Sequence, residues 1–155
     1  MYTFVDENGF KVDLRFDEGP FDVEPKHVLV LVQHNGKWLC TIHKRRGVEV
    51  PGGKLEPAET LEQAAIREVY EETSVKIGDL QWFAYYIVHD EKPFCKAVFT
   101  GKVRSIDPFV GDYETSGMTW LTEEELWQQP NLSFYMRDAG MKKMLQEVKT
   151  HGRQW

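Results

Sequence analysis

The chain has 155 residues, the length of one ordinary domain, and its 41% hydrophobic and 13% aromatic residues are enough for a buried core. A formal net charge of −6 counts against a protein that binds duplex DNA through a broad basic surface, because such binding depends on neutralising phosphate charge. The N-terminus lacks the basic and apolar segments of a secretory signal and no stretch reaches the length of a membrane span, so we expect a single cytoplasmic domain with no membrane partner.

The N-terminal third of the chain predicts two β-hairpins. Asn8 and Gly9 separate the first pair of strands, and Asn-Gly accepts the positive φ angles of a type I′ turn. Asn35 and Gly36 do the same for the second pair, whose first strand is almost continuously apolar, as expected of a strand buried on both faces. The predicted strand pairs are residues 3–5 with 10–16 and residues 27–33 with 37–43.

A helix is predicted to follow the Pro-Gly-Gly turn of residues 51–53, between Glu59 and Thr73. Thr60 followed by Gln63 is the pattern of a capping box, in which each side chain binds the backbone N–H of the other residue. Apolar residues at helical spacing predict the face that this helix turns to the core. They are Leu61, Ala64, Ala65 and Val69.

Strands resume after this helix, and a second helix comes last. Strands on both sides of one central helix, with another helix at the end, predict a mixed sheet sandwiched between helices in a single α/β domain. Cys40 and Cys95 stand singly in predicted strands, at a spacing that fits neither a zinc site nor a redox pair, and we expect both to be reduced core residues. The later elements are strands over residues 80–88, 94–103 and 119–121 and a helix over residues 133–148.

Acidic residues crowd the C-terminal half of the central helix. At roughly 100° per residue, Glu68 and Glu72 fall about 40° apart on the face that should be apolar, and Glu71 lies beside them. Like charges at i and i+4 destabilise an exposed helix by roughly 0.2–0.5 kcal/mol, and partial burial without a partner costs more. Arg67 is one cation against three acids, so Mg²⁺ or Mn²⁺ is the better counter-charge. A solvated acidic helix face is the alternative.

The spacing around these acids extends the pattern. Gly53 is followed after five residues by Glu59, and after seven more by the run Arg-Glu-Val-Tyr-Glu-Glu-Thr-Ser-Val of residues 67–75. This run resembles the signature box of the Nudix hydrolases, here residues 53–75, at every fixed position but one. The order of the predicted strands also resembles that family's fold. The resemblance implies an α/β/α sandwich with a mixed central sheet, formed by residues 1–155 as one domain.

Ser74 is the position that departs from the box, where the family usually has glycine. Glycine suits the left-handed residue that ends a helix, and a serine there is strained by about 1 kcal/mol if the backbone is unchanged. The departure puts the geometry of the helix end in doubt. It removes no carboxylate, so it does not indicate an inactive relative.

Roles for the box residues follow from the resemblance. Glu68 is implied to act as, or to position, the base for the attacking water, and Arg67 with Glu59 is implied to form a supporting ion pair that orients Glu68. The backbone carbonyl of Gly52 is implied to be a metal ligand, because two glycines let the backbone approach an ion closely. The implied side-chain ligands are Glu68, Glu71 and Glu72.

Residues outside the box complete the expected site. MutT-like members of the family draw one more ligand from a loop ahead of a tryptophan, a place that Glu114 fits in this chain, with Asp112 as its rival. Arg45 or Arg46, in the densest basic cluster of the chain, is expected to bind substrate phosphate, the alternative being a solvated turn. Asn131 is a candidate for reading a base edge, and equally for a helix cap.

The resemblance implies hydrolysis of a nucleoside triphosphate, such as the oxidised purine 8-oxo-dGTP, to a nucleoside monophosphate and pyrophosphate with Mg²⁺ or Mn²⁺. An RNA 5′-triphosphate end is the alternative substrate, served by a local basic track through Lys37, Lys44, Arg45 and Arg46. Sugar nucleotides and dinucleoside polyphosphates stay open. A noncatalytic nucleotide-binding module is the hypothesis from another class, although such relatives typically lose the box carboxylates. The sequence does not indicate an oligomeric state.

Overall fold

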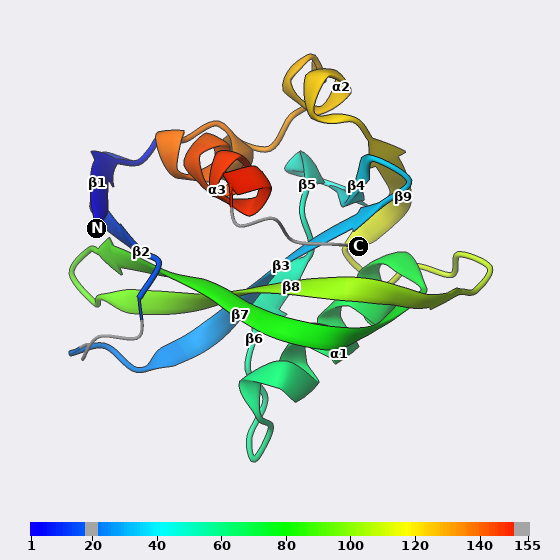
Figure 1. The fold of residues 1–155 in the computed structure, drawn as a ribbon, viewed down its shortest axis with the longest axis horizontal. Helices are drawn as coiled ribbons and strands as arrows, with labels where there is room; N and C mark the ends of the chain where they lie inside the picture. The colour runs from blue at the N-terminus through cyan, green and yellow to red at the C-terminus, as the bar shows by residue number, and fades with distance from the viewer. Residues whose placement is uncertain (18–21, 151–155) are drawn as a thin grey trace.

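The computed structural model describes residues 1–17 and 22–150, which form a mixed sheet with helices on both of its faces (Figure 1). The first strands are β1 (Tyr2–Val5), β2 (Lys11–Arg15), β3 (Pro25–His34), β4 (Lys37–His43), β5 (Gly47–Glu49) and β6 (Gly52–Lys54). After helix α1 (Leu61–Thr73) come β7 (Val75–His89), β8 (Phe94–Ile106) and β9 (Thr115–Leu121). The chain then forms α2 (Glu123–Trp127), the 3₁₀ helix η1 (Phe134–Met136) and α3 (Ala139–Thr150).

The sheet has the strand order β1-β2-β7-β8-β3-β4-β5, with β6 paired to β3 and β9 paired to β4. Strands β3 and β8 run parallel, and the other pairs are antiparallel, so the predicted mixed sheet is confirmed. Strand β3 is the centre of this arrangement, because it pairs with β8 along one side and with β6 and then β4 along the other. The short strand β6 therefore places the first box residues directly beside the centre of the sheet.

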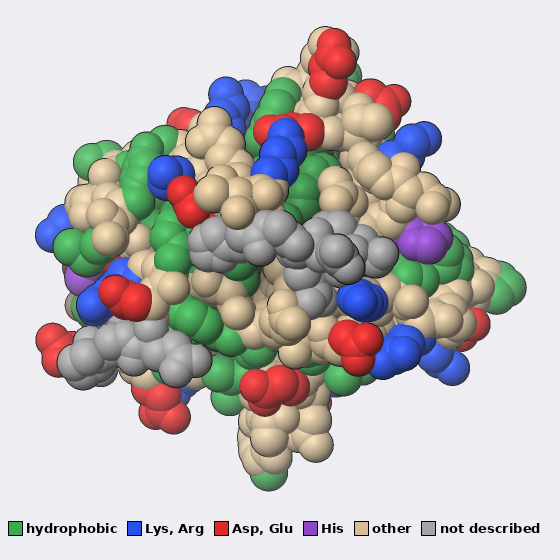
Figure 2. Space-filling model, viewed as in Figure 1, with side chains coloured by type: hydrophobic (Ala, Val, Ile, Leu, Met, Phe, Trp, Pro, Cys, Tyr) green, Lys and Arg blue, Asp and Glu red, His purple; other side chains and the backbone are tan. Residues whose placement is uncertain are grey.

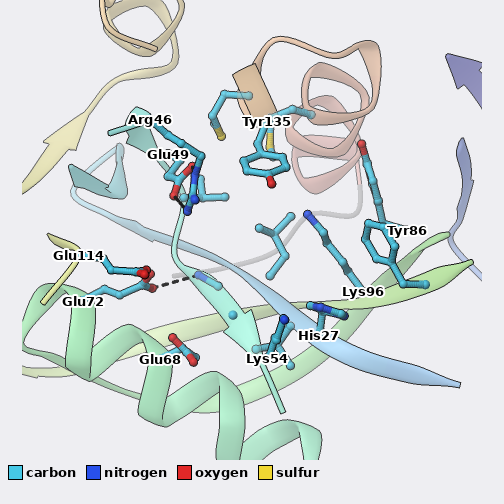
Figure 3. Close-up of a pocket in the computed structure, with 18 of the residues that line it drawn as sticks. His27, Arg46, Glu49, Lys54, Glu68, Glu72, Tyr86, Lys96, Glu114 and Tyr135 are labelled. Atoms are coloured by element: carbon cyan, nitrogen blue, oxygen red, sulfur yellow. Dashed lines mark hydrogen bonds and ion pairs between the residues drawn. The ribbon is translucent and has the colours of Figure 1, made fainter. Parts of the chain in front are cut away.

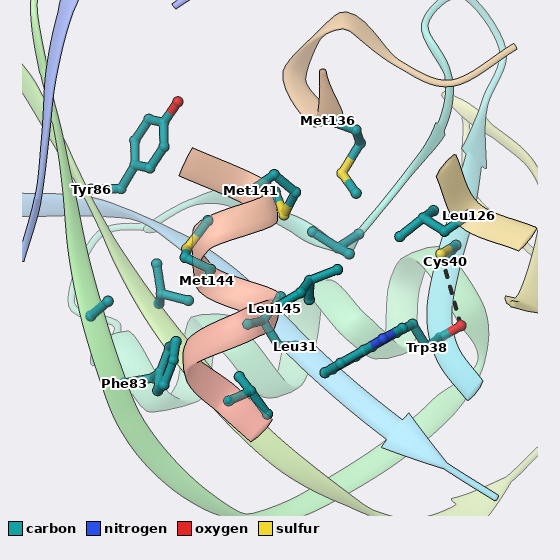
Figure 4. Packing of buried hydrophobic residues seen from close by; sticks show 14 of the residues in the cluster. Leu31, Trp38, Cys40, Phe83, Tyr86, Leu126, Met136, Met141, Met144 and Leu145 are labelled. Atoms are coloured by element: carbon teal, nitrogen blue, oxygen red, sulfur yellow. Dashed lines mark hydrogen bonds between the residues drawn. The ribbon is translucent and has the colours of Figure 1, made fainter. Parts of the chain in front are cut away.

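Each face of the sheet buries its own hydrophobic core. On one face, Val28, Val30 and Val32 of β3 pack with α1, whose predicted core residues Ala64, Ala65 and Val69 are fully buried while Leu61 is half-buried. On the other face, Leu31 packs with α3 and with Trp38 of β4 (Figure 4). The alternation of β3 between the two cores confirms that this strand is buried on both faces. Met141, Met144, Leu145 and Val148 form the buried side of α3.

Both predicted hairpins are present, but only one has the predicted turn. Asn35 and Gly36 have φ angles of 53° and 76°, as a type I′ turn requires. In the first hairpin Gly9 has φ 84° and Asn8 is not left-handed, so the type I′ prediction is wrong there. The reason is Asp6, whose carboxylate accepts hydrogen bonds from the amides of Asn8 and Phe10, each at 2.9 Å, and so stabilises a longer loop.

Several predicted element boundaries differ from the structure, among them the end of β8 at Ile106 and the start of β9 at Thr115. Strand β7 begins at Val75, directly after α1, and not at residue 80. The last helix begins at Ala139 and not at Ser133, because Asp138 accepts a hydrogen bond from the Met141 amide at 2.9 Å and caps it there. Strands β5 and β6 and helix α2 were not anticipated, since runs of three to five residues carry too little periodicity to be recognised.

Other expectations concern the core and the surface. Cys40 and Cys95 are buried and free, as predicted. Among the described residues, no helix is long and apolar enough to cross a membrane. Acidic and basic side chains are interspersed on the face shown in Figure 2, which has no broad basic patch.

Ser74 ends α1 in the left-handed conformation that the family's glycine would adopt, with φ 63° and ψ 20°. Its amide donates to the Tyr70 carbonyl at 2.8 Å, and its hydroxyl accepts from the Val110 amide at 3.1 Å. The backbone geometry is therefore unchanged, and the serine offsets its strain with a hydrogen bond that glycine lacks.

Replacement of Ser74 tests this compensation. Ser74→Ala keeps the strain of about 1 kcal/mol and loses the hydrogen bond, so it should lower the free energy of unfolding by roughly 1 kcal/mol. Ser74→Gly loses the same bond but relieves the strain, and should leave stability nearly unchanged. Urea unfolding of the three proteins measures both effects, and equal destabilisation by the two variants would contradict this account.

Candidate active site

Two glycines bring the backbone of β6 close to both the sheet and α1. A Cβ at Gly52 would lie 2.4 Å from the Val28 carbonyl oxygen, and a Cβ at Gly53 would lie 2.4 Å from Cδ of Glu68. Neither position has room for a side chain, so any other residue would push β6 away from the sheet or displace the Glu68 carboxylate. This close approach places Glu68 against the Gly-Gly backbone.

Arg67 joins four groups around this backbone. Its Nε and Nη2 donate to the two carboxylate oxygens of Glu59 at 2.7 and 2.9 Å, so the predicted ion pair is present and bidentate. Its Nη1 donates to Glu68 at 2.9 Å and to Glu71 at 3.3 Å, and Nη2 also donates to the Lys54 carbonyl at 3.0 Å. The hydrogen bond from Arg67 lowers the pKa of Glu59 to about 2. One guanidinium thus fixes the loop before α1 and the rotamer of Glu68.

The surroundings of Glu68 and Glu72 disfavour ionisation of both carboxyl groups. Burial raises the pKa of Glu68 even though Arg67 donates to it. Burial, then the nearby charge of Glu68, raises the pKa of Glu72 to about 9, and the only hydrogen bond given to Glu72 among the described residues comes from the Gly52 amide at 3.1 Å. Both carboxylates line the same cavity. The protein therefore concentrates acid where its own groups do not neutralise it.

Glu71 lies beside the cavity and does not line it. Its side chain is 47% exposed, and its nearest cation is Arg67. A side chain three residues after Glu68 is rotated about 60° away from it on a helix with roughly 100° per residue, which explains the outward position. Ligation by Glu71 stays a prediction, and it requires the carboxylate to turn away from Arg67.

The loop before β9 brings two more carboxylates to the cavity, those of Asp112 and Glu114. One oxygen of Asp112 accepts from the amides of Glu114 and Thr115, at 3.0 and 2.8 Å, and this holds the loop. Glu114 is 73% exposed and lies 3.6 Å from Nε2 of His43. Because Nδ1 of His43 accepts the amides of Arg45 and Arg46, each at 3.1 Å, the neutral ring carries its proton on Nε2 and turns an N–H toward Glu114.

These residues surround a cavity of about 500 Å³ with two unlike walls (Figure 3). The acidic wall comes from α1 and the loop before β9, and it carries Glu68, Glu72, Asp112 and Glu114. The opposite wall comes from β3, β6, β8 and η1. Its polar side chains are those of His27, Lys54, Lys96 and Tyr135.

The structure separates the two candidate arginines. Arg46 lines the cavity, where Glu49 holds it through hydrogen bonds at 3.1 Å to Nε and 2.8 Å to Nη2. Arg45 is exposed and does not line the cavity. Asn131 is also exposed and does not line the cavity. Its backbone carbonyl accepts a hydrogen bond from the Val48 amide at 2.9 Å. It caps no helix either, since Ser133 caps η1.

Lys96, His27, Tyr135 and Glu49 line the cavity but were not singled out from the sequence. Lys96 left one usable signal, because it is a charged residue between Cys95 and Ala97 in the otherwise apolar first half of β8. The others lie in segments with no recognisable motif. The pairing of β3 with β8, the pairing of β5 with β4 and the return of the chain through η1 bring them to the site.

The donor set fits a divalent cation. Among the described residues, no three acidic, histidine or cysteine side chains lie close enough to form a ready-made metal site. The acidic wall nonetheless offers only oxygen donors, which Mg²⁺ and Mn²⁺ prefer, and burial raises the pKa of Glu68 and Glu72, an effect that a bound cation would offset. A bound cation would remove the repulsion that keeps these carboxylates apart.

Comparison with known proteins agrees with this geometry. A family model for the NUDIX domain matches residues 21–146. The chain is 37% identical over 155 residues to YtkD of Bacillus subtilis (strain 168), assigned as an 8-oxo-dGTP diphosphatase, with 98% of each chain covered. It is 32% identical over 114 residues to the phosphatase NudJ of Escherichia coli, covering 68% of this chain and 74% of NudJ. A crystal structure of a mutant of the Bacillus subtilis pyrophosphohydrolase BsRppH superposes with a TM-score of 0.89 at 37% identity, over 98% of both chains.

Glu72→Gln tests the electrostatic cost of the acidic wall in metal-free protein. The pKa of Glu72 rises from 4.5 to about 9 on folding, so its ionisation removes stability progressively as the pH rises between those values. Glutamine removes that loss, and the variant should gain melting temperature relative to the parent as the pH is raised. Thermal unfolding from pH 5 to pH 9 in EDTA checks this, with Glu62→Gln on the exposed first turn of α1 as control. Parallel pH profiles of parent and Glu72→Gln would contradict it.

Proposed function

The chain belongs to the Nudix hydrolase family, and from that membership and its site geometry we propose that it hydrolyses nucleoside 5′-triphosphates to a nucleoside monophosphate and pyrophosphate. The observation that carries the proposal is the two-walled cavity. Its acidic wall suits the cations that accompany a polyphosphate. The opposite wall, which carries Lys54 and Lys96, suits the phosphate oxygens that those cations do not contact. A wall of one sign alone would serve only one of these tasks.

Divalent cations, Mg²⁺ or Mn²⁺, would be held by Glu68, Glu71, Glu72 and Glu114 with the Gly52 carbonyl. When bound, they would stabilise the charge that develops on the phosphate oxygens. This ligand set is the one that the family resemblance implies. Glu68, Glu72, Glu114 and Gly52 line the cavity, which supports it. Asp112 is the alternative to Glu114, although one of its oxygens already holds two loop amides.

The proposed base is Glu68. Its carboxylate lies in the cavity, and its raised pKa brings its proton affinity closer to that needed to accept a proton from the attacking water near neutral pH. Arg67 is proposed as the positioning residue, because its hydrogen bond fixes one oxygen of Glu68 and leaves the other for the water. Glu59 accepts hydrogen bonds from Nε and Nη2 of Arg67 and is proposed to keep it in place.

Arg46 is proposed to bind a phosphate of the substrate. Nε and Nη2 of the Arg46 guanidinium donate to Glu49, so its Nη1 stays available for a phosphate oxygen. Arg45 and Asn131, the other candidates, lie outside the cavity and would need a loop movement to reach a substrate there. Arg46 is therefore the proposed contact with the substrate phosphate.

The preferred substrate is an oxidised purine triphosphate such as 8-oxo-dGTP, which the likeness to YtkD supports. An RNA 5′-triphosphate end is the second candidate, because a smaller cavity of about 160 Å³ shares four residues with the first and offers room beyond one nucleotide. The expected basic track does not run into the site, since Arg46 alone of Lys37, Lys44, Arg45 and Arg46 lines the cavity. The buried free cysteines support a reducing, cytoplasmic location.

Pyrophosphate release from a panel of nucleotides tests the proposed function. The panel contains 8-oxo-dGTP, dGTP, the common ribonucleotides and a triphosphorylated oligonucleotide, each with Mg²⁺, with Mn²⁺ or with EDTA. We expect cation-dependent hydrolysis that Glu68→Gln lowers roughly a hundred- to ten-thousandfold, because a positioned base contributes about that much. Glu62→Gln, which removes an exposed carboxylate from the same helix, should keep full activity.

Three results would redirect the proposal. Near-normal turnover by Glu68→Gln would remove Glu68 from the catalytic role. Faster hydrolysis of the oligonucleotide than of any free nucleotide would make the RNA end the substrate. No hydrolysis of any compound would favour a noncatalytic nucleotide-binding module.

A further inference from the structure

Lys96 is the one lysine of β8 that lines both cavities, since Lys102 of the same strand lines neither. Its ammonium lies 5.0 Å from the centre of the Tyr135 ring and 5.4 Å from the centre of the Tyr86 ring. Figure 3 shows it pointing from β8 into the space between Tyr135 and the sheet. Two aromatic faces stabilise a cation at this point without supplying a hydrogen-bond acceptor.

The two carboxylates whose charges act most strongly on Lys96 already accept hydrogen bonds from other groups. Asp138 accepts the Tyr86 hydroxyl on one oxygen and the Met141 amide on the other. Glu49 binds Arg46 through both of its oxygens. Both acids act on Lys96 only as nearby charges.

The ammonium of Lys96 is therefore left without an acceptor. Within residues 1–17 and 22–150, no hydrogen bond and no ion pair joins it to another side chain or to the backbone. Lys96 is half-buried, and burial lowers the pKa of its ammonium, whose three donors face the cavity. An anionic ligand would satisfy these donors.

Further cations lie on the same side of the cavity. Arg46 lies 5.1 Å from the centre of the same Tyr135 ring, so one ring contacts two cations. Burial, then the charges of Lys96 and Lys54, lowers the pKa of His27 on the adjacent strand. Burial and the positive charge of Lys96 and Lys54 together disfavour protonation of His27.

We propose that Lys96 and Arg46, which both contact the ring of Tyr135, form a subsite for a phosphate group of the substrate. The subsite lies across the cavity from the carboxylates of α1, so it takes phosphate charge that cations on the acidic wall do not reach. The inference rests on the proposed function and deepens it, because it makes Lys96 a determinant of affinity for long phosphate chains. A ribose or a base also offers acceptor atoms, but it carries no negative charge to offset that of the ammonium, so its hydrogen bonds to Lys96 would be weaker than those of a phosphate.

Two ligands test this subsite, one with a non-hydrolysable α,β bridge and one without a nucleoside. Calorimetry with Mg²⁺ measures the dissociation constants of an α,β-methylene nucleoside triphosphate and of inorganic triphosphate. Lys96→Met should weaken both roughly ten- to hundredfold, the usual effect of losing a charge-assisted hydrogen bond. Lys96→Arg should restore most of the affinity, because it keeps the charge. Lys102→Met removes one charge from the same strand outside both cavities and should change neither constant.

The outcomes separate this inference from the proposed function. Unchanged affinity of Lys96→Met for either ligand, in a variant with a cooperative melting transition, would overturn the subsite even if the enzyme hydrolyses triphosphates. Weaker binding of the nucleotide analogue alone would show that Lys96 contacts the nucleoside and would also overturn it. Weakened binding of both ligands would support the subsite even if no hydrolysis were found.

Discussion

The contact between the Glu68 carboxylate and the backbone of Gly53 is the constraint on which the site depends. A Cβ at residue 53 would lie 2.4 Å from Cδ of Glu68, so strand β6 and helix α1 can approach this closely only through glycine. Because β6 is paired to β3, the contact fixes the carboxylate relative to the centre of the sheet. Arg67 completes the constraint by holding Glu68 on one side and Glu59 on the other. The spacing of the box is thus a requirement of packing as well as of chemistry.

The site concentrates charge in a way that costs stability. Ionisation of the half-buried Glu72 is disfavoured, its pKa rising to about 9, and burial lowers the pKa of the half-buried Lys96. Each group would be more favourable in water, and neither is neutralised by a direct ion pair with its neighbours. The two α1 and α3 cores, which bury residues such as Val69 and Met144 completely, supply the stability that tolerates these charges. A ligand with both cations and phosphate satisfies the two walls together.

The helix end shows how a departure from the box is tolerated. Ser74 keeps the left-handed conformation and adds a hydrogen bond to the loop that follows β8. That loop continues to Asp112 and Glu114, so the residue in place of glycine also contacts the segment that leads to the second acidic group of the cavity. Local strain at the end of α1 is therefore offset by order in a neighbouring loop.

The sequence by itself determined whatever local periodicity or a fixed spacing encodes. The capping box, the apolar face of α1, the second hairpin turn and the Arg67–Glu59 pair all involve residues within about two helical turns of one another, where the geometry of one element dictates the contact. Only the tertiary structure decided that Arg46 and not Arg45 faces the cavity, and that Lys96 lies opposite the acids. These outcomes depend on which strands become neighbours, and the parallel pairing of β3 with β8 joins segments about 70 residues apart, beyond the reach of any local pattern.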